Sequence, residues 1–210
     1  MQRFNCLNAM MSMMLLMAVA VLAGCATGSG GITLKDDSFK VKNANVALLP
    51  PRLALGSNTG IVIGIEHKAK DVIYNELTIR TTSNWIAPDD AVSKIQDANV
   101  LTEYEAFLDG YVRTGIPSKD KLAKIGKAIG SDYIALATIS HQVSGRIGMG
   151  GYRQAGMSLQ VLSVNNGKLV LEVSGDADCG SGAYDVGADA LINQAAKQAI
   201  SYYPELKVVK

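Results

Sequence analysis

The chain has 210 residues, 20 Lys and Arg against 19 Asp and Glu, and 48% hydrophobic residues, which predicts one domain with room for a tail. The apolar content excludes a disordered chain. A balanced charge and an aromatic share of only 6% argue against a nucleic-acid surface, because phosphate binding needs a basic excess and single strands need stacking rings.

The N-terminus has the pattern of a signal peptide, which we place at residues 1–24. Arg3 carries the only side-chain charge before an apolar stretch from Met10 to Leu22. That stretch of about 13 residues is too short to cross a hydrocarbon core of about 30 Å, so a permanent membrane-spanning helix is disfavoured. The alternative is a short buried helix.

The residues Leu22-Ala23-Gly24-Cys25 resemble the lipobox of bacterial lipoproteins, in which a branched and two small residues precede a lipidated cysteine. By this resemblance, signal cleavage falls between Gly24 and Cys25, and Cys25 is the lipidation site that carries the fatty acyl chains. Two or three chains, at about 0.8 kcal/mol per buried methylene, hold a protein stably at a membrane. Ala26, where the family's sorting rule looks for Asp, favours the outer membrane, facing the periplasm.

Cysteine use and charge fit this location. Cys6 leaves with the signal peptide and Cys25 becomes a thioether, so Cys179 is the remaining thiol and no internal disulfide is expected. Cleavage also removes Arg3, which leaves equal numbers of basic and acidic residues. Membrane attachment must therefore come from the lipid and not from a polybasic patch.

Residues 25–44 are rich in Gly, Ser, Lys and Asp, and we interpret them as a flexible tether. Residues 45–210 then form a single α/β periplasmic domain. It begins with a buried strand from Asn45 that Pro50 and Pro51 close. Residues 52–66 fit either a loop or a second strand.

Apolar periodicity and end signals predict the middle of the domain. The expected elements, in chain order, are a helix over 68–80, a short strand over 84–87, a helix from Pro88, a helix with the stripe Leu101, Tyr104, Leu108 and Val112, a helix between Ser118 as N-cap and Gly130 as stop, and a strand over 133–139 covered on both faces, or at least at its start. We expect Trp85 in the core and not as a platform for a ligand.

Two alternating segments around Asn165-Asn166-Gly167 predict an antiparallel hairpin. A three-residue loop over 165–167 sets Val161 against Leu171 and keeps the apolar side chains of both strands on one face. We therefore expect that loop, with Gly167 in the left-handed conformation.

Cys179 continues the apolar phase of the second hairpin strand, which favours a buried, inert thiol over a reactive or intermolecular one. The chain then ends in a helix over 184–203 with an Ala-rich stripe, whose small side chains allow close packing on a sheet. The predicted fold is thus α/β: a mixed β-sheet with a C-terminal antiparallel hairpin, packed by several helices that include this one.

The order of these pieces resembles the periplasmic lipoprotein superfamily that includes CsgG, the LpoB-type activators of penicillin-binding proteins and the N-terminal domain of TolB. The resemblance covers residues 45–203 and includes the segments 121–134 and 161–168. It implies an α/β sandwich that carries protein contacts and no catalytic site. The long amphipathic hairpins of the channel-forming member have no counterpart here, so we expect no pore.

Enzyme and metal readings find little support. His67 and His141 are the only histidines, and no Gly-x-Ser-x-Gly motif accompanies them; we expect His141 to be half-buried and hydrogen-bonded. The glycines of residues 145–151 lack the spacing of a phosphate loop. The acids Asp176, Asp178, Asp185 and Asp189 fail the pattern of a calcium loop, although a weak surface cation site stays open. We expect no catalytic residues, no cofactor and no metal.

The sequence therefore predicts an outer-membrane-anchored lipoprotein that acts as a non-enzymatic accessory or assembly factor. Its partner would be a periplasmic or outer-membrane protein, bound through a sheet edge or through loops such as 145–151. One alternative is a ring-forming subunit of an envelope export machine, which implies a homo-oligomer. Another is a hydrolase with an unrecognised site.

Overall fold

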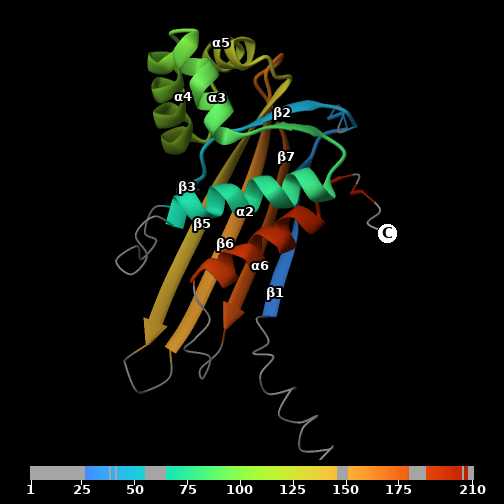
Figure 1. Cartoon of the computed structure of the whole chain (residues 1–210), viewed down its shortest axis with the longest axis vertical. Helices are drawn as coiled ribbons and strands as arrows, with labels where there is room; N and C mark the ends of the chain where they lie inside the picture. Colours follow the sequence, from blue (N-terminus) through green and yellow to red (C-terminus); the bar gives the residue numbers. More distant parts are fainter. Residues whose placement is uncertain are drawn as a thin grey trace, which may run out of the picture.

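The computed structural model describes residues 27–37, 39–40, 42–54, 65–145, 151–179, 188–204 and 206–207. Within these ranges a mixed sheet of seven strands is packed by five helices, which confirms the predicted α/β class. The long strands run along the longest axis of the molecule (Figure 1).

The sheet has an antiparallel and a parallel half. In the antiparallel half the order is β1 (Thr27–Lys35), β7 (Leu169–Cys179), β6 (Gly151–Ser163) and β5 (Tyr133–Gly145). In the parallel half, β5 is followed by β2 (Asn45–Leu48) and β4 (Asn84–Ile86), while β3 (Arg52–Leu53) pairs with β5 farther along. The undecided segment 52–66 thus begins with a short strand; residues 55–64 lie outside the described part.

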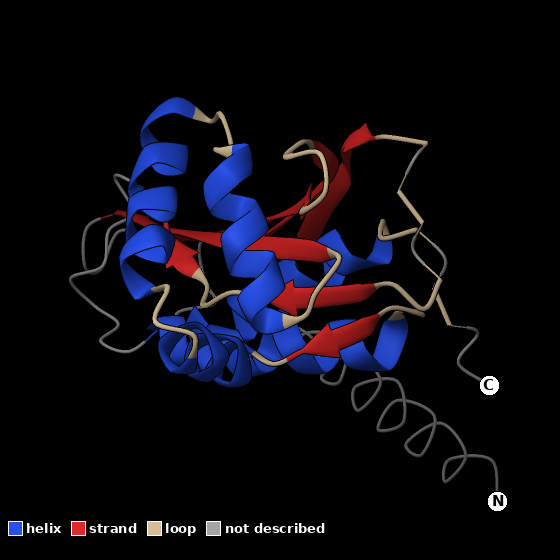
Figure 2. Ribbon diagram, turned by 90° about the horizontal axis from the view of Figure 1, so that it is seen from above, coloured by secondary structure: helices blue, strands red, loops and turns tan. Residues whose placement is uncertain are grey.

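Helices cover the two faces unequally (Figures 1 and 2). The helices α2 (Ile65–Arg80) and α6 (Ala188–Ser201) pack along one face. The other face carries α3 (Pro88–Asp97), α4 (Leu101–Thr114) and α5 (Lys119–Ile129) over one end of the sheet, and we call these three helices the cap. The first residues of β5 alternate between the two cores, with Ala135 under α2 and α6 and Ile134 under the cap, which confirms a strand covered on both faces at its start.

The flexible tether is the main correction. Residues 27–35 form the strand β1, which pairs antiparallel with β7 from Thr27↔Asp178 to Lys35↔Leu171. Its inner face carries glycine where other strands carry apolar side chains. A Cβ at Gly30 would lie 2.8 Å from the ring of Tyr202, so glycine lets α6 approach the strand. The boundary at residues 24 and 25 lies outside the described part and stays a prediction.

The hairpin of β6 and β7 has the predicted register but a different turn. Val161 pairs with Leu171, and Gly167 is left-handed with φ of 70°. The register then shifts at Leu162, which pairs with Leu169, so residues 164–168 lie outside the strands. The three-residue loop was therefore wrong, because a bulge next to the turn takes up one residue.

The predicted helix boundaries are confirmed at Gly130, which ends α5 with φ of 78°, whereas the Ser118 side chain makes no capping hydrogen bond. Trp85 packs against the core, as predicted, and its indole N–H donates to Thr81 Oγ1 at 2.7 Å. The predicted stripe was half correct for α4: Tyr104 and Leu108 pack against the core under the cap, whereas Leu101 and Val112 are exposed. The buried residues of α4 are Phe107 and Tyr111.

The Ala-rich helix lies as close to the sheet as its small side chains predict. Beneath Ala195 and Ala199 of α6, the strand β7 carries Gly175. A Cβ at this position would lie 2.6 Å from the carbonyl oxygen of Ala195 and would also meet the backbone nitrogen of Ala199. Backbone therefore packs against backbone at this crossing.

Candidate functional site

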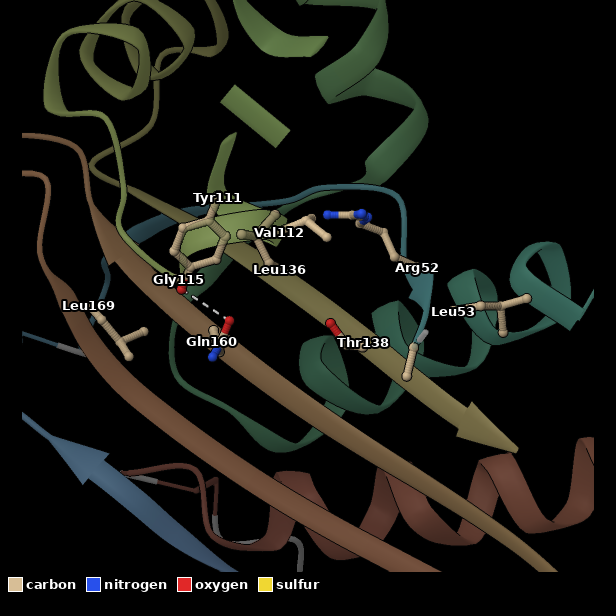
Figure 3. A pocket seen from close by; sticks show the side chains of 10 residues that line it. Arg52, Leu53, Tyr111, Val112, Gly115, Leu136, Thr138, Gln160 and Leu169 are labelled. Carbon is tan, nitrogen blue, oxygen red and sulfur yellow. Dashed lines mark hydrogen bonds between the residues drawn. The ribbon is translucent and has the colours of Figure 1, made fainter. Parts of the chain in front are cut away.

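A pocket of about 390 Å³ opens where the cap meets the sheet (Figure 3). Its polar lining consists of Arg52, Tyr111, Thr138 and Gln160. Its apolar lining consists of Leu53, Ala54, Val112, Leu136 and Leu169, with Gly115 at the end of α4. This volume and this mixture of apolar walls with a few polar groups are typical of small-molecule sites.

Arg52 owes its place to the two prolines that end β2. The chain restarts as β3, which sets Arg52 beside Thr138 of β5. In Figure 3 the Arg52 side chain reaches toward Val112 of α4. Burial raises the pKa of Tyr104, and the positive charge of Arg52 opposes that shift, so the guanidinium lies near α4. Among the described residues, Arg52 forms no ion pair.

Tyr111 closes the other side of the pocket. Helix α4 stops at Gly115, whose left-handed φ of 67° lets its N–H donate to the Tyr111 carbonyl. The Tyr111 hydroxyl donates to Gln160 Oε1 at 3.0 Å, and Gln160 Nε2 donates to Glu172 Oε1 at 2.9 Å. Burial, together with the charge of Glu172, raises the pKa of Tyr111 to about 12.

This chain of hydrogen bonds fixes the chemistry of the pocket wall. Because Glu172 accepts a hydrogen bond from the amide nitrogen of Gln160, the amide oxygen faces Tyr111 and accepts the hydrogen bond of its hydroxyl. Tyr111 therefore presents lone pairs to the pocket. The donors lie opposite, on Arg52 and Thr138.

We expect the Tyr111→Phe variant to lose less stability in alkaline solution than the wild type. An unfolded tyrosine ionises near pH 10, whereas the pKa of folded Tyr111 is about 12. Between these values the native state holds more protons, so its free energy of unfolding falls as pH rises. Urea denaturation between pH 9 and about 12 measures the slope. Equal slopes in the two proteins would contradict the assigned burial of the hydroxyl.

Beyond the cap, the outer face of the antiparallel strands carries polar side chains in cross-strand rows, and we call it the open face. Its described side chains are Ser29, Thr138, Ser140, Gln142, Gln154, Ser158, Gln160, Glu172, Ser174, Asp176 and Asp178. The charged side chains in this set are all acids of β7. The pocket lies between the open face and the cap.

One end of the sheet collects the start of β1, the end of β7, the end of β5 and the start of β6. Thr27 pairs with Asp178, and Gly145 pairs with Gly151. The cap lies at the opposite end (Figure 1). Because β5 has 13 residues, roughly 40 Å separate the two ends.

None of the described residues that were predicted to carry function lines this pocket. Gly24, Cys25 and residues 146–150 of the glycine-rich loop lie outside the described part. Cys179 is buried, as predicted, with 4% of its surface exposed. His141 is more deeply buried than the half-burial expected, at 3%, because it faces the α2 and α6 side of the sheet.

The acidic residues separate in the structure. Asp176 and Asp178 lie on the open face, whereas Asp189 on α6 pairs with Lys68 of α2 at 2.6 Å. Asp185 lies outside the described ranges. Over the described ranges, no group of three or more His, Cys, Asp or Glu side chains is placed to hold a metal ion.

Sequence reasoning missed the pocket because its residues come from distant elements. Arg52 fell in a segment left between loop and strand, and Tyr111 and Gln160 are 49 positions apart. No short motif joins them. The one usable signal was the spacing of Phe107 and Tyr111, which places two aromatic rings on the same face of α4.

Comparison with solved structures places this fold among known ones. PelC from Paraburkholderia phytofirmans, a dodecamer, matches with a TM-score of 0.50 and 12% identity over 83% of this chain and 96% of PelC. CT253 from Chlamydia trachomatis matches with a TM-score of 0.51 and 11% identity over 76% of this chain and 94% of CT253. The chain therefore shares its fold with both proteins.

The resemblance to the superfamily of CsgG, LpoB and TolB has weaker structural support. The C-terminal domain of LpoB from Salmonella enterica matches with a TM-score of 0.39 and 12% identity, over 67% of this chain and 86% of that one. This structural similarity is too weak to establish a shared fold, so the relationship to LpoB stays a prediction. No family model and no curated protein matches the sequence.

The described helices were also compared with the dimensions of a bilayer. None of them combines the length and the apolarity that a membrane crossing requires.

Proposed function

We propose that this chain is an envelope lipoprotein, acylated at Cys25, that acts as a non-enzymatic accessory or assembly factor and docks its protein partner along the strand β1. One observation carries the proposal: β1 forms an edge of the sheet, and only Ala26 separates it from the lipobox cysteine. Among the described strands, none pairs with the outer side of β1.

The chemistry of β1 suits the addition of a strand. From Thr27 to Leu34 the strand has no charged side chain and no proline, the devices that usually protect a sheet edge. Ile32 and Leu34 are 47% and 37% exposed, which offers apolar contacts beside the backbone hydrogen bonds. A partner segment in extended conformation fits this surface.

Attachment through Cys25 would determine which end of the sheet faces the membrane. An acylated Cys25 brings the start of β1 and the neighbouring ends of β5 and β6 to the lipid surface, and the cap then points away from it. The lipobox resemblance and Ala26 support the outer membrane, with the body in the periplasm. The lipid supplies the attachment, because the mature chain has no excess of basic residues.

This geometry bears on the identity of the partner. Two β1 strands paired antiparallel would carry their Cys25 residues at opposite ends of the joint sheet. Two copies anchored in one membrane cannot adopt that arrangement. Antiparallel pairing of β1 with its own copy is thus disfavoured, and the proposal assigns the docked strand to a different protein.

A second candidate is a ring-forming subunit of an envelope machine. The fold shared with PelC, a dodecamer, favours it. In a ring each copy contacts the next through two different surfaces. The copies can then all keep their lipids on one side.

Photo-crosslinking from position 31 tests the proposal. Gly31 lies on β1, and Gly110 lies on α4; a Cβ at either glycine meets no atom within 4 Å, so both positions accept a benzoylphenylalanine side chain. We expect the full chain in cells to form one dominant adduct with another envelope protein from position 31 and none of that mass from position 110.

Three other results are informative. An adduct between two copies of the chain would favour the ring subunit over the accessory factor. Absence of any adduct from position 31, or the same adducts from position 110, would contradict docking on β1.

A further inference from the structure

We propose that the pocket between the cap and the sheet binds a small monocarboxylate with an apolar alkyl or aryl body. The inference does not depend on the lipid or on β1, because the pocket lies at the other end of the sheet. It rests on Arg52, on the donor and acceptor pattern of the walls and on the size of the cavity.

Arg52 selects an anion. Its guanidinium lines the pocket and forms no ion pair with a described carboxylate. Thr138, its neighbour in the β3–β5 pairing, adds a hydroxyl on the same side. A guanidinium binds a carboxylate through two parallel hydrogen bonds, and the nearby hydroxyl can supply a third.

The opposite wall orients the ligand. The Tyr111 hydroxyl donates its hydrogen bond to Gln160, so an anion placed there would meet the hydroxyl's lone pairs, with the carboxylate of Glu172 behind them. The head group must therefore lie at Arg52 and Thr138. The apolar body then extends over Leu136 and Val112 toward Leu169.

The charges of Arg52 and Glu172 favour a carboxylate ligand over a phosphate. Among the described residues the pocket lining holds one cation, Arg52, and the polar chain that ends at Glu172 brings one anion close to it. A phosphate dianion would need further cations to offset its second charge. A cavity of about 390 Å³ suits a ligand of about a dozen heavy atoms.

The experiment uses 4-phenylbutyrate as the probe and 4-phenylbutyramide, which has the same shape without the charge, as its partner. The full chain is held in lipid nanodiscs, with empty nanodiscs as the blank. Saturation-transfer NMR measures binding of each compound. We expect the carboxylate to bind at least about tenfold more tightly than the amide, the ratio that a hydrogen-bonded charge contributes.

Three variants separate the pocket from the surface. Arg52→Gln should weaken carboxylate binding by about 10- to 100-fold and leave amide binding unchanged. Arg113→Gln, on the exposed side of α4, is the matched control and should change neither. Val112→Trp should fill the pocket and abolish binding of both compounds. Because Val112 is 37% exposed, the indole ring can be accommodated there and the variant protein should still fold.

Some outcomes would overturn the inference. They are no binding of the carboxylate, equal binding of the amide, or the same affinity in Arg52→Gln as in the wild type. A failure of this kind would leave the adducts from position 31 untouched, and a failure of those adducts would leave carboxylate binding untouched. The two proposals are thus tested separately.

Discussion

Gly175→Ala is expected to lower the free energy of unfolding by about 3 kcal/mol, at the upper end of the range for overpacked cores. The added methyl would lie 2.6 Å from the carbonyl oxygen of Ala195 and against the backbone nitrogen of Ala199. A side chain could rotate away, but here the helix backbone must move. The helix would lift from β7 and loosen the contacts of Ile192 and Ile200 in the same core.

Urea denaturation followed by circular dichroism measures this loss, and Gly31→Ala is its matched control. Gly31 lies on the neighbouring strand β1, where a Cβ meets no atom within 4 Å. We expect the control to change stability by less than about 1 kcal/mol. If both variants unfolded at the same urea concentration, the close packing of α6 on β7 would be incorrect.

Cys25→Ala is expected to abolish lipid attachment completely. The variant removes the thiol to which the lipobox resemblance assigns the acyl chains, and cleavage after Gly24 follows lipid transfer in that family. Labelling of cells with an alkyne analogue of palmitate should give no signal for the variant, and its intact mass should include residues 1–24. An alanine retains no nucleophile that could replace the sulfur.

Cys179→Ala is the matched control for lipid attachment. It also removes one sulfur, but Cys179 is buried in β7, so this variant should keep the full palmitate label and the processed mass. Label that persists in Cys25→Ala would place the lipid elsewhere. Label lost equally from both variants would show that folding, and not Cys25 itself, decides acylation.

The sequence predicted those elements whose apolar side chains follow a regular period. Helix α5, strand β5 and the register of β6 with β7 belong to this group, because each buries a row of large residues. Strand β1 was missed for the opposite reason. Its inner face is made of Gly28 and Gly30, and glycine in a sequence indicates a loop as readily as a close contact with a helix.

The pocket shows a different limit of sequence reasoning. The apolar stripe predicted on α4 had the correct members Tyr104 and Leu108 but ended on Val112, so Tyr111 was not identified as a buried residue. The orientation of Gln160 depends on Glu172 across the hairpin and on Tyr111 across the layers. Such a polar chain becomes visible only when the strands are paired and the cap is in place.

The position of β1 also determines how the protein would stand on a bilayer. A free linker of about 20 residues would let the domain wander through a radius of about 25 Å. With β1 paired to β7 from Thr27 onward, that slack is absent, so acylation at Cys25, as proposed, would hold the sheet upright on the membrane. The cap would then lie at a constant height above the lipid, and the number of residues in the long strands would set that height.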